Sequence, residues 1–197
     1  MAEYYATEGI VLYAWERGEA DRLFVLYTKE LGLVHALAKG VRLEKSKLRS
    51  HLQLFSLGTL RFVNGRELFR IIDAHEQGRV RPTGNTTACF EAFGAVAAFL
   101  RRMVHGTGAD GAVWKLLHGA FVSLQTGVSE QEMSALQALF RARLLYRLGY
   151  VSPYEVHPKI PRILAVSEFT PKILERATEC LPLLRQMIEN GVHASQM

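Results

Sequence analysis

The chain has 197 residues, of which 49% are hydrophobic and 22% are charged, and its formal net charge is +5 at pH 7. These values predict a globular protein of one large or two small domains and exclude a largely disordered chain. No run approaches the roughly 18 uncharged apolar residues of a membrane span, and no basic region followed by an apolar stretch opens the sequence. We therefore expect a cytoplasmic protein without a membrane segment.

The first part of the chain predicts strands, because β-branched and aromatic residues dominate its short apolar runs. The dipeptide Asn64-Gly65 separates the last two runs and favours the two-residue type I′ turn of a β-hairpin. Apolar side chains on both faces of the first two runs favour a small closed barrel. The five predicted strands span residues 6–13, 22–28, 33–38, 57–63 and 67–72.

From Thr83 onward the hydrophobic period is helical, with apolar residues at steps of three and four over 90–104, 113–124 and 133–148. The third helix begins with a capping-box pattern, Ser129 to Glu132, and ends at Gly149. Three prolines then predict irregular structure, and Pro171 begins a last helix that Pro182 should kink or divide. The sequence thus predicts an α+β protein, with a five-stranded OB-fold barrel in residues 1–80 and a helical domain in residues 81–197.

A basic segment, residues 39–49, follows the third predicted strand and holds five cations and one anion. Such a cluster can neutralise several phosphates at once, although it can also be a solvated loop or a short helix. Bases would need flat groups for stacking, and aromatic strand residues more often belong to a core. The stacking candidates are Tyr13, Trp15 and Tyr27. The phosphate-contacting candidates are Lys39, Arg42, Lys45, Lys47 and Arg49, with Arg22 as a further neighbour.

Two short motifs are the most specific parts of the sequence, Gly18-Glu19-Ala20-Asp21-Arg22-Leu23 and Ala38-Lys39-Gly40-Val41-Arg42. Together with Thr7 to Leu12, Leu52 to Ser56 and Leu148-Gly149-Tyr150, they make residues 5–150 resemble the RecO family of bacterial recombination mediators. The resemblance implies an N-terminal OB-fold, a helical C-terminal domain and binding of single-stranded and double-stranded DNA. It also implies annealing of complementary strands, assistance in recombinase loading, and partnership with RecR and with the acidic tail of single-stranded DNA-binding protein, SSB.

Many members of that family carry a four-cysteine zinc module after the Leu-Gly-Tyr helix, whereas Val151 to Val166 contain no cysteine. Because a tetrahedral thiolate site needs those ligands, we expect no structural zinc and no other cofactor. The part beyond Thr170 is also short for the family. Two function classes therefore stay open, a non-catalytic DNA-binding and annealing mediator, and an interaction adaptor that kept the fold but binds little DNA. RNA binding by the same barrel is a third option, since OB-folds serve either nucleic acid.

Enzyme motifs are weak in this chain. Residues 106–111 satisfy Gly-x-Gly-x-x-Gly, yet they follow a helical stripe, so we expect a loop between helices and no dinucleotide site. The acidic residues Glu19 and Asp21 are expected to cap amides or to pair with local cations. No other catalytic or metal-binding pattern is present, and we expect no catalytic activity.

Arg143 and Arg147 lie one turn apart beside the apolar stripe of the third predicted helix. Cations beside an apolar groove suit an acidic peptide with an aromatic anchor, which is the character of an SSB tail. The alternative is that both arginines cover the core with their stems while their charged heads reach water or an internal carboxylate.

Overall fold

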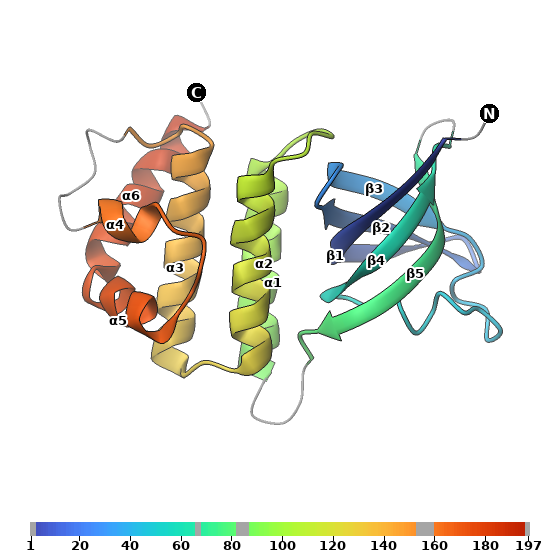
Figure 1. Ribbon diagram of the computed structural model, residues 1–197, viewed down its shortest axis with the longest axis horizontal. Helices are drawn as coiled ribbons and strands as arrows, with labels where there is room; N and C mark the ends of the chain where they lie inside the picture. The colour runs from blue at the N-terminus through green and yellow to red at the C-terminus, as the bar shows by residue number, and fades with distance from the viewer. Residues whose placement is uncertain (1–2, 66–67, 82–86, 153–159, 196–197) are drawn as a thin grey trace. The chain divides into compact units, whose positions relative to one another are not determined.

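The computed structural model describes residues 3–65, 68–81, 87–152 and 160–195 and shows an α+β fold, with strands first and helices after them (Figure 1). The strands are β1 (Tyr4–Arg17), β2 (Asp21–Thr28), β3 (Gly32–Ala38), β4 (Ser56–Val63) and β5 (Phe69–Arg79). The helices are α1 (Thr87–Met103), α2 (Gly111–Thr126), α3 (Glu130–Arg147), α4 (Pro161–Leu164), α5 (Pro171–Glu179) and α6 (Leu181–Ala194).

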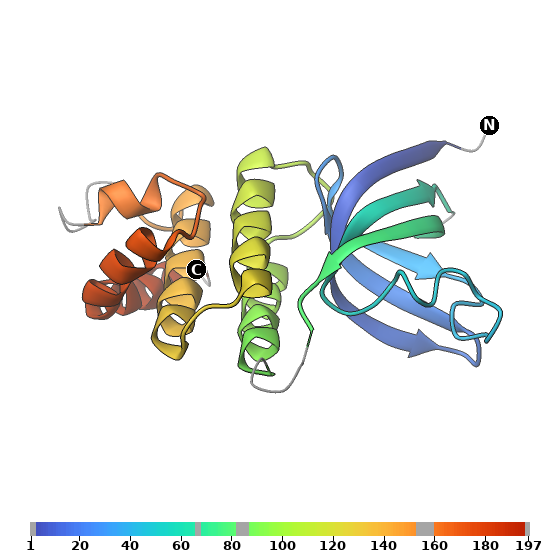
Figure 2. The same ribbon diagram turned by 60° about the horizontal axis from the view of Figure 1, so that its bottom comes forward.

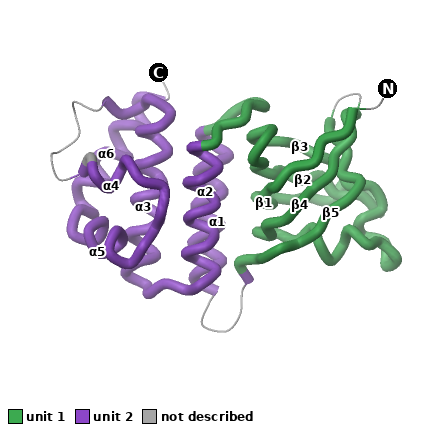
Figure 3. The backbone as a smooth tube through the Cα atoms, viewed as in Figure 1, with its two compact units in different colours: residues 1–80, 104–111 green, residues 81–103, 112–197 purple. Residues whose placement is uncertain are grey.

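The chain divides into two compact units (Figure 3). The first comprises residues 1–80 together with 104–111, and the second comprises residues 81–103 and 112–197. Residues 104–111 connect α1 to α2, so the Gly-x-Gly-x-x-Gly stretch is an interhelical loop, as predicted. Its place in the first unit was not predicted from the sequence; Thr107 forms an isolated β-bridge with Gly32 at the start of β3.

The five strands close into a barrel in the order β1-β2-β3-β5-β4. Neighbouring strands are antiparallel except β3 and β5, which pair in parallel over two positions. This strand order is that of an OB-fold, so the predicted N-terminal OB-fold in an α+β protein is confirmed. Closure buries the inner face of every strand. The core holds Val11, Phe24, Leu26, Val34, Ala36, Ala38, Val41, Leu52, Leu60, Phe62, Ile71 and Ala74.

The hairpin between β4 and β5 is confirmed, but the predicted two-residue turn is wrong. Val63 pairs with Arg70, so the connection is longer, and Gly65 is not among the glycines with positive φ that a type I′ turn requires. The start of β5 is determined by core packing instead, because the ring of Phe69 lies 5.6 Å from that of Tyr5 and 6.0 Å from that of Phe62. The predicted strand start at Glu67 lies outside the described residues.

Local capping signals set the helix boundaries in the second unit. Ser129 accepts a hydrogen bond from the Glu132 N–H at 3.4 Å, and the Glu132 carboxylate accepts from the Ser129 N–H at 2.8 Å, which confirms the capping box at α3. The last helical region is divided, since α5 ends at Glu179 and α6 begins at Leu181 with Pro182 in its first turn. The proline-containing segment includes the short helix α4, which was not predicted; Pro153 and Pro158 lie outside the described residues.

None of the helices in the described part of the chain combines the length and the apolar character that a membrane crossing requires. Cys89 and Cys180 are both buried and have free thiols.

Candidate nucleic-acid interface

The two most specific motifs of the sequence contact each other in the structure. The N–H of Gly40 donates to the carboxylate of Asp21 at 2.8 Å, and the N–H of Arg42 donates to the carbonyl of Ala20 at 2.9 Å. Gly40 has a φ of 64°, a left-handed conformation that favours glycine. Asp21 is therefore an amide-capping residue, as predicted, and its capping bond fastens the start of the basic segment to the turn between β1 and β2.

Apolar side chains hold the same region of chain against the barrel. Val41 and Leu52 are buried in the barrel core, and Leu48 packs against it. Between them the backbone forms successive turns without helix or strand, as the cyan trace in Figure 2 shows. At the far end, the guanidinium of Arg79 on β5 donates to the carbonyl of Ser50 at 3.1 Å. The basic segment is thus an irregular surface loop tied to the barrel on both sides.

The structure separates the six predicted phosphate-contacting cations into two groups. Arg42 and Arg22 both pair with Glu16 on β1, with N to O distances of 3.3 Å and 3.8 Å. Arg42 also donates to the carbonyl of Gly18 at 3.2 Å. The remaining cations are exposed and project from the loop: Lys39, Lys45, Lys47 and Arg49. That any of the six contacts phosphate stays a prediction.

Sequence reasoning missed the role of Glu16. The residue lies between the first two predicted strands, and in the structure it belongs to β1 and stands opposite Arg22. Its second cation, Arg42, is 26 positions further along the chain, so only the barrel brings the two together. No local signal in the sequence would have identified this pairing.

Two of the three predicted stacking aromatics lie at the surface together. Tyr13 and Trp15 on β1 are 44% and 40% exposed, and their ring centroids are 5.9 Å apart with a tilt of 40°. Trp15 pairs with Leu23, and Leu23 pairs with Leu37 near the end of β3. Two strand spacings amount to about 10 Å, so the aromatic pair lies close to the beginning of the basic segment.

Tyr27, the third stacking candidate, is fully buried. Its hydroxyl donates to the carbonyl of Asp110 at 3.5 Å, and burial raises the pKa of this phenol, with the charge of Asp110 acting in the same direction. Tyr27 is a core residue and offers no ring face to a base.

The structure places Arg143 and Arg147 in different surroundings. Arg143 is fully buried: it donates to the carbonyls of Ile163 at 2.8 Å and Glu168 at 2.9 Å, and its guanidinium lies 4.7 Å from the ring centroid of Phe169. Contrary to the expectation, its charged head reaches neither water nor a carboxylate: it donates to two backbone carbonyls inside the protein, and its Nη2 has no hydrogen-bond partner among the described residues. Arg147 is half-buried and donates to the hydroxyl of Ser167 at 2.9 Å.

The electrostatics of Arg143 follow from this burial. Burial lowers the pKa of its guanidinium to about 9, the charge of Arg147 adds to that effect, and the carboxylate of Glu168 opposes it. An acidic peptide would have to displace internal hydrogen bonds to reach this charge. Binding of an SSB tail by Arg143 and Arg147 stays a prediction, and the structure offers it no preformed surface at Arg143.

Taken together, the exposed basic loop and the aromatic pair have the two properties that a single-stranded nucleic acid requires, cations that follow phosphates and flat faces for bases. Within the described residues, no three His, Cys, Asp or Glu side chains gather where they could hold a metal ion.

The chain is similar to proteins named DNA repair protein RecO. Residues 1–76 match the family described as recombination protein O, N terminal. A DNA repair protein RecO from Rubrobacter xylanophilus is 32% identical over 146 residues, which cover 74% of this chain and 58% of the relative. One from Heliobacterium modesticaldum is 31% identical over 150 residues, covering 74% and 52%. One from Gloeothece citriformis is 39% identical over 92 residues, covering 45% and 32%. The chain thus matches between a third and somewhat more than half of the length of these relatives.

Proposed function

The chain belongs to the RecO family through its N-terminal region, and on this premise we propose that it is a non-catalytic DNA-binding protein of recombinational repair. In this proposal it binds single-stranded and double-stranded DNA, anneals complementary strands and assists recombinase loading. RecR and the SSB tail are its proposed partners, and the cytoplasm is its proposed location. The DNA-binding surface is the basic segment together with Tyr13 and Trp15.

The observation that carries the proposal is the exposure of four cations on a loop that is fastened to an OB-fold barrel beside an exposed aromatic pair. Several hydrogen bonds hold the loop, so the side chains need little ordering when they meet a phosphate backbone. The loop carries no sequence-reading element such as a helix that could enter a groove. Affinity should therefore be electrostatic and only weakly dependent on base sequence.

The same surface would also promote the annealing of complementary strands. Two complementary strands repel each other until their phosphate charges are screened, and exposed lysines provide that screening without covering the Watson–Crick edges. Stacking on Tyr13 and Trp15 would hold bases unpaired and accessible. The proposal needs no bond-breaking step, which is consistent with a protein that acts by holding strands.

The test is a fluorescence anisotropy titration of a labelled single-stranded DNA oligonucleotide at several salt concentrations, followed by a strand-annealing assay. If about four cations contact phosphates, log affinity should fall against log salt with a slope near −3, at about 0.7 per contact. An RNA oligonucleotide of the same sequence distinguishes DNA from RNA binding. Absence of affinity for any of these strands at low salt would favour the interaction adaptor instead.

A further inference from the structure

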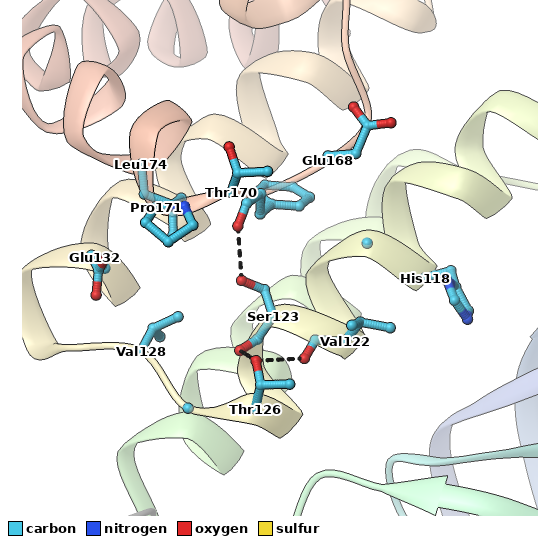
Figure 4. A pocket seen from close by; sticks show the side chains of 13 residues that line it. His118, Val122, Ser123, Thr126, Val128, Glu132, Glu168, Thr170, Pro171 and Leu174 are labelled. Atoms are coloured by element: carbon cyan, nitrogen blue, oxygen red, sulfur yellow. Dashed lines mark hydrogen bonds between the residues drawn. The ribbon is translucent and has the colours of Figure 1, made fainter.

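The second unit contains a groove that the proposed function does not use (Figure 4). It has a volume of about 570 Å³ and lies between α2, the connection from α2 to α3, and the residues that lead into α5. A volume of this size holds a drug-sized ligand or a few side chains of a peptide. All of the residues that line it belong to the second unit.

The groove has an apolar surface. Val122 on α2 lines the groove and is 41% exposed, although valine is usually turned toward a core. Phe169 and Leu174 contribute from the opposite wall, where both are otherwise well buried. Val128 and Pro171 complete the apolar lining. An occupant with a large apolar side chain would remove this surface from water.

Two hydroxyl groups in the groove, those of Ser123 and Thr126, already donate hydrogen bonds to backbone carbonyls. The Ser123 hydroxyl donates to the carbonyl of Phe169 at 3.1 Å, and the Thr126 hydroxyl donates within α2, where the Val122 carbonyl lies at 3.1 Å (Figure 4). Both oxygens therefore offer only lone pairs to an occupant. A ligand that meets these two oxygens has to bring hydrogen-bond donors.

The charged side chains of the groove favour a ligand that carries positive charge. Glu168 is exposed, and Glu132 stays ionised because its bonds from Ser129 hold the pKa of its carboxyl below the usual range. Figure 4 shows these two carboxylates at separate sides of the groove. Among the thirteen described residues that line it there is no Lys and no Arg. Arg143 contacts the ring of Phe169 but does not itself line the groove.

The shape indicates what kind of molecule would fit. His118, Val122 and Thr126 recur every four residues, so they form one stripe along α2. The eight residue-to-residue steps from His118 to Thr126 rise about 12 Å, which is the length of about four residues of extended peptide. An elongated apolar groove of this length suits a peptide better than a compact small molecule.

We propose that this groove binds an extended segment of a partner protein in which a Lys or Arg stands beside a large apolar side chain. The apolar side chain packs against the exposed Val122, and the cation meets the carboxylate of Glu168 or of Glu132. An acidic segment is disfavoured because like charges would face each other across the groove. This site is independent of the proposed DNA-binding surface, and it selects the opposite charge from an SSB tail.

The test uses the full chain and two fluorescein-labelled peptides, Gly-Lys-Leu-Phe-Lys-Gly and Gly-Glu-Leu-Phe-Glu-Gly, in anisotropy titrations. The lysine peptide should bind saturably and more tightly than the glutamate peptide. Val122→Lys and Glu168→Lys should each weaken the lysine peptide by about tenfold, which corresponds to about 1.4 kcal/mol. Glu168→Gln should have a smaller effect in the same direction. Thermal unfolding of each variant verifies that it is folded.

Glu175→Lys is the matched control, because this glutamate is exposed on α5 and does not line the groove, while the change in net charge is the same. Its affinity for the lysine peptide should stay within about twofold of the original protein. The proposal is overturned if the lysine peptide does not bind, if the glutamate peptide binds as tightly, or if Glu168→Lys and Glu175→Lys weaken binding equally. None of these outcomes depends on whether the barrel binds DNA.

Discussion

Arg42 forms an ion pair with Glu16, with 3.3 Å between Nη1 and Oε2, and this contact joins the basic segment to β1. Arg42 therefore anchors the loop to the barrel, whether or not its other N–H groups contact phosphate. The lysines of the loop have no such structural task among the hydrogen bonds and ion pairs of the described residues. Phosphate contacts should therefore come mainly from the projecting cations.

The first prediction follows from this division. Replacing Lys45, Lys47 and Arg49 by alanine should flatten the salt dependence of single-stranded DNA binding by about two units, since each contact contributes about 0.7. The loss should be similar for all base sequences. Anisotropy titrations at several salt concentrations measure it.

Lys29→Ala is a suitable control for that triple variant, because Lys29 is an exposed cation of the same barrel that pairs with Glu8 at 3.3 Å. The slope of Lys29→Ala should match that of the unchanged protein. If the triple variant kept its full slope, the DNA would bind elsewhere on the protein.

The second prediction concerns the aromatic pair. Trp15→Ala should weaken single-stranded DNA binding by about 1–3 kcal/mol without changing the salt slope, because stacking is lost and no charge is removed. Trp15→Phe should keep most of the affinity. The chain has two tryptophans, and Trp114 is only 6% exposed, so quenching of tryptophan fluorescence by DNA should disappear in both variants. Unchanged affinity in Trp15→Ala would show that the ring is not a stacking platform.

The third prediction concerns the buried arginine. Arg143→Ala should lower the free energy of unfolding by about 3 kcal/mol or more, since it leaves two carbonyls unpaired and opens a cavity. Arg147→Ala should cost about 1 kcal/mol, because it loses a single hydrogen bond at a half-buried position. Urea unfolding measures both. A smaller loss for Arg143→Ala than for Arg147→Ala would contradict the packing described for Arg143. Charge reversal at Arg143 should unfold the second unit, so an SSB-tail test must change Arg147 alone.

The fourth prediction is a pH dependence of the α3 capping box. Ser129 holds the pKa of Glu132 below its usual value of 4.5. A carboxyl with a lowered folded-state pKa stabilises the fold fully above its unfolded pKa, and the stabilisation is lost as the pH falls through the folded value. Glu132→Gln should therefore unfold more easily than the unchanged protein near neutral pH, and the difference should shrink as the pH falls below the usual value of 4.5.

Glu130→Gln is the control variant for Glu132→Gln. Glu130 is also in the first turn of α3 but takes no part in the capping box. Its smaller effect reports the helix dipole alone. Equal effects of the two substitutions at every pH, in thermal unfolding, would count against a specific role of the capping bond.

The fifth prediction is the absence of structural zinc. The purified protein should contain no stoichiometric zinc by elemental analysis, and a chelator should leave its thermal unfolding unchanged, because residues 151–166 contain no cysteine that could ligate the metal. One zinc ion per chain would contradict it.

Much of the fold could be predicted because its signals are local or periodic. Hydrophobic spacing identified the strands and the principal helices, and apolar residues on both faces of β1 and β2 indicated a closed barrel. Ser129 and Glu132 lie one helical turn apart, so their mutual capping is visible in four residues of sequence. The exposed lysines of residues 39–49 could likewise be identified, since a run of charge is hydrated in almost any fold.

Other features depended on contacts between distant residues. The turn after Val63 follows the packing of Phe69 in the barrel and overrides the preference of Asn64-Gly65. Arg22 and Arg42 meet Glu16 only because the barrel joins their strands, and Arg143 is buried because the chain around Ile163 and Glu168 presents carbonyls to it. The sequence by itself determined which elements form and where charge accumulates. Only the tertiary structure decided which charges are paired, buried or available, because burial and pairing depend on neighbours that are far apart in the chain.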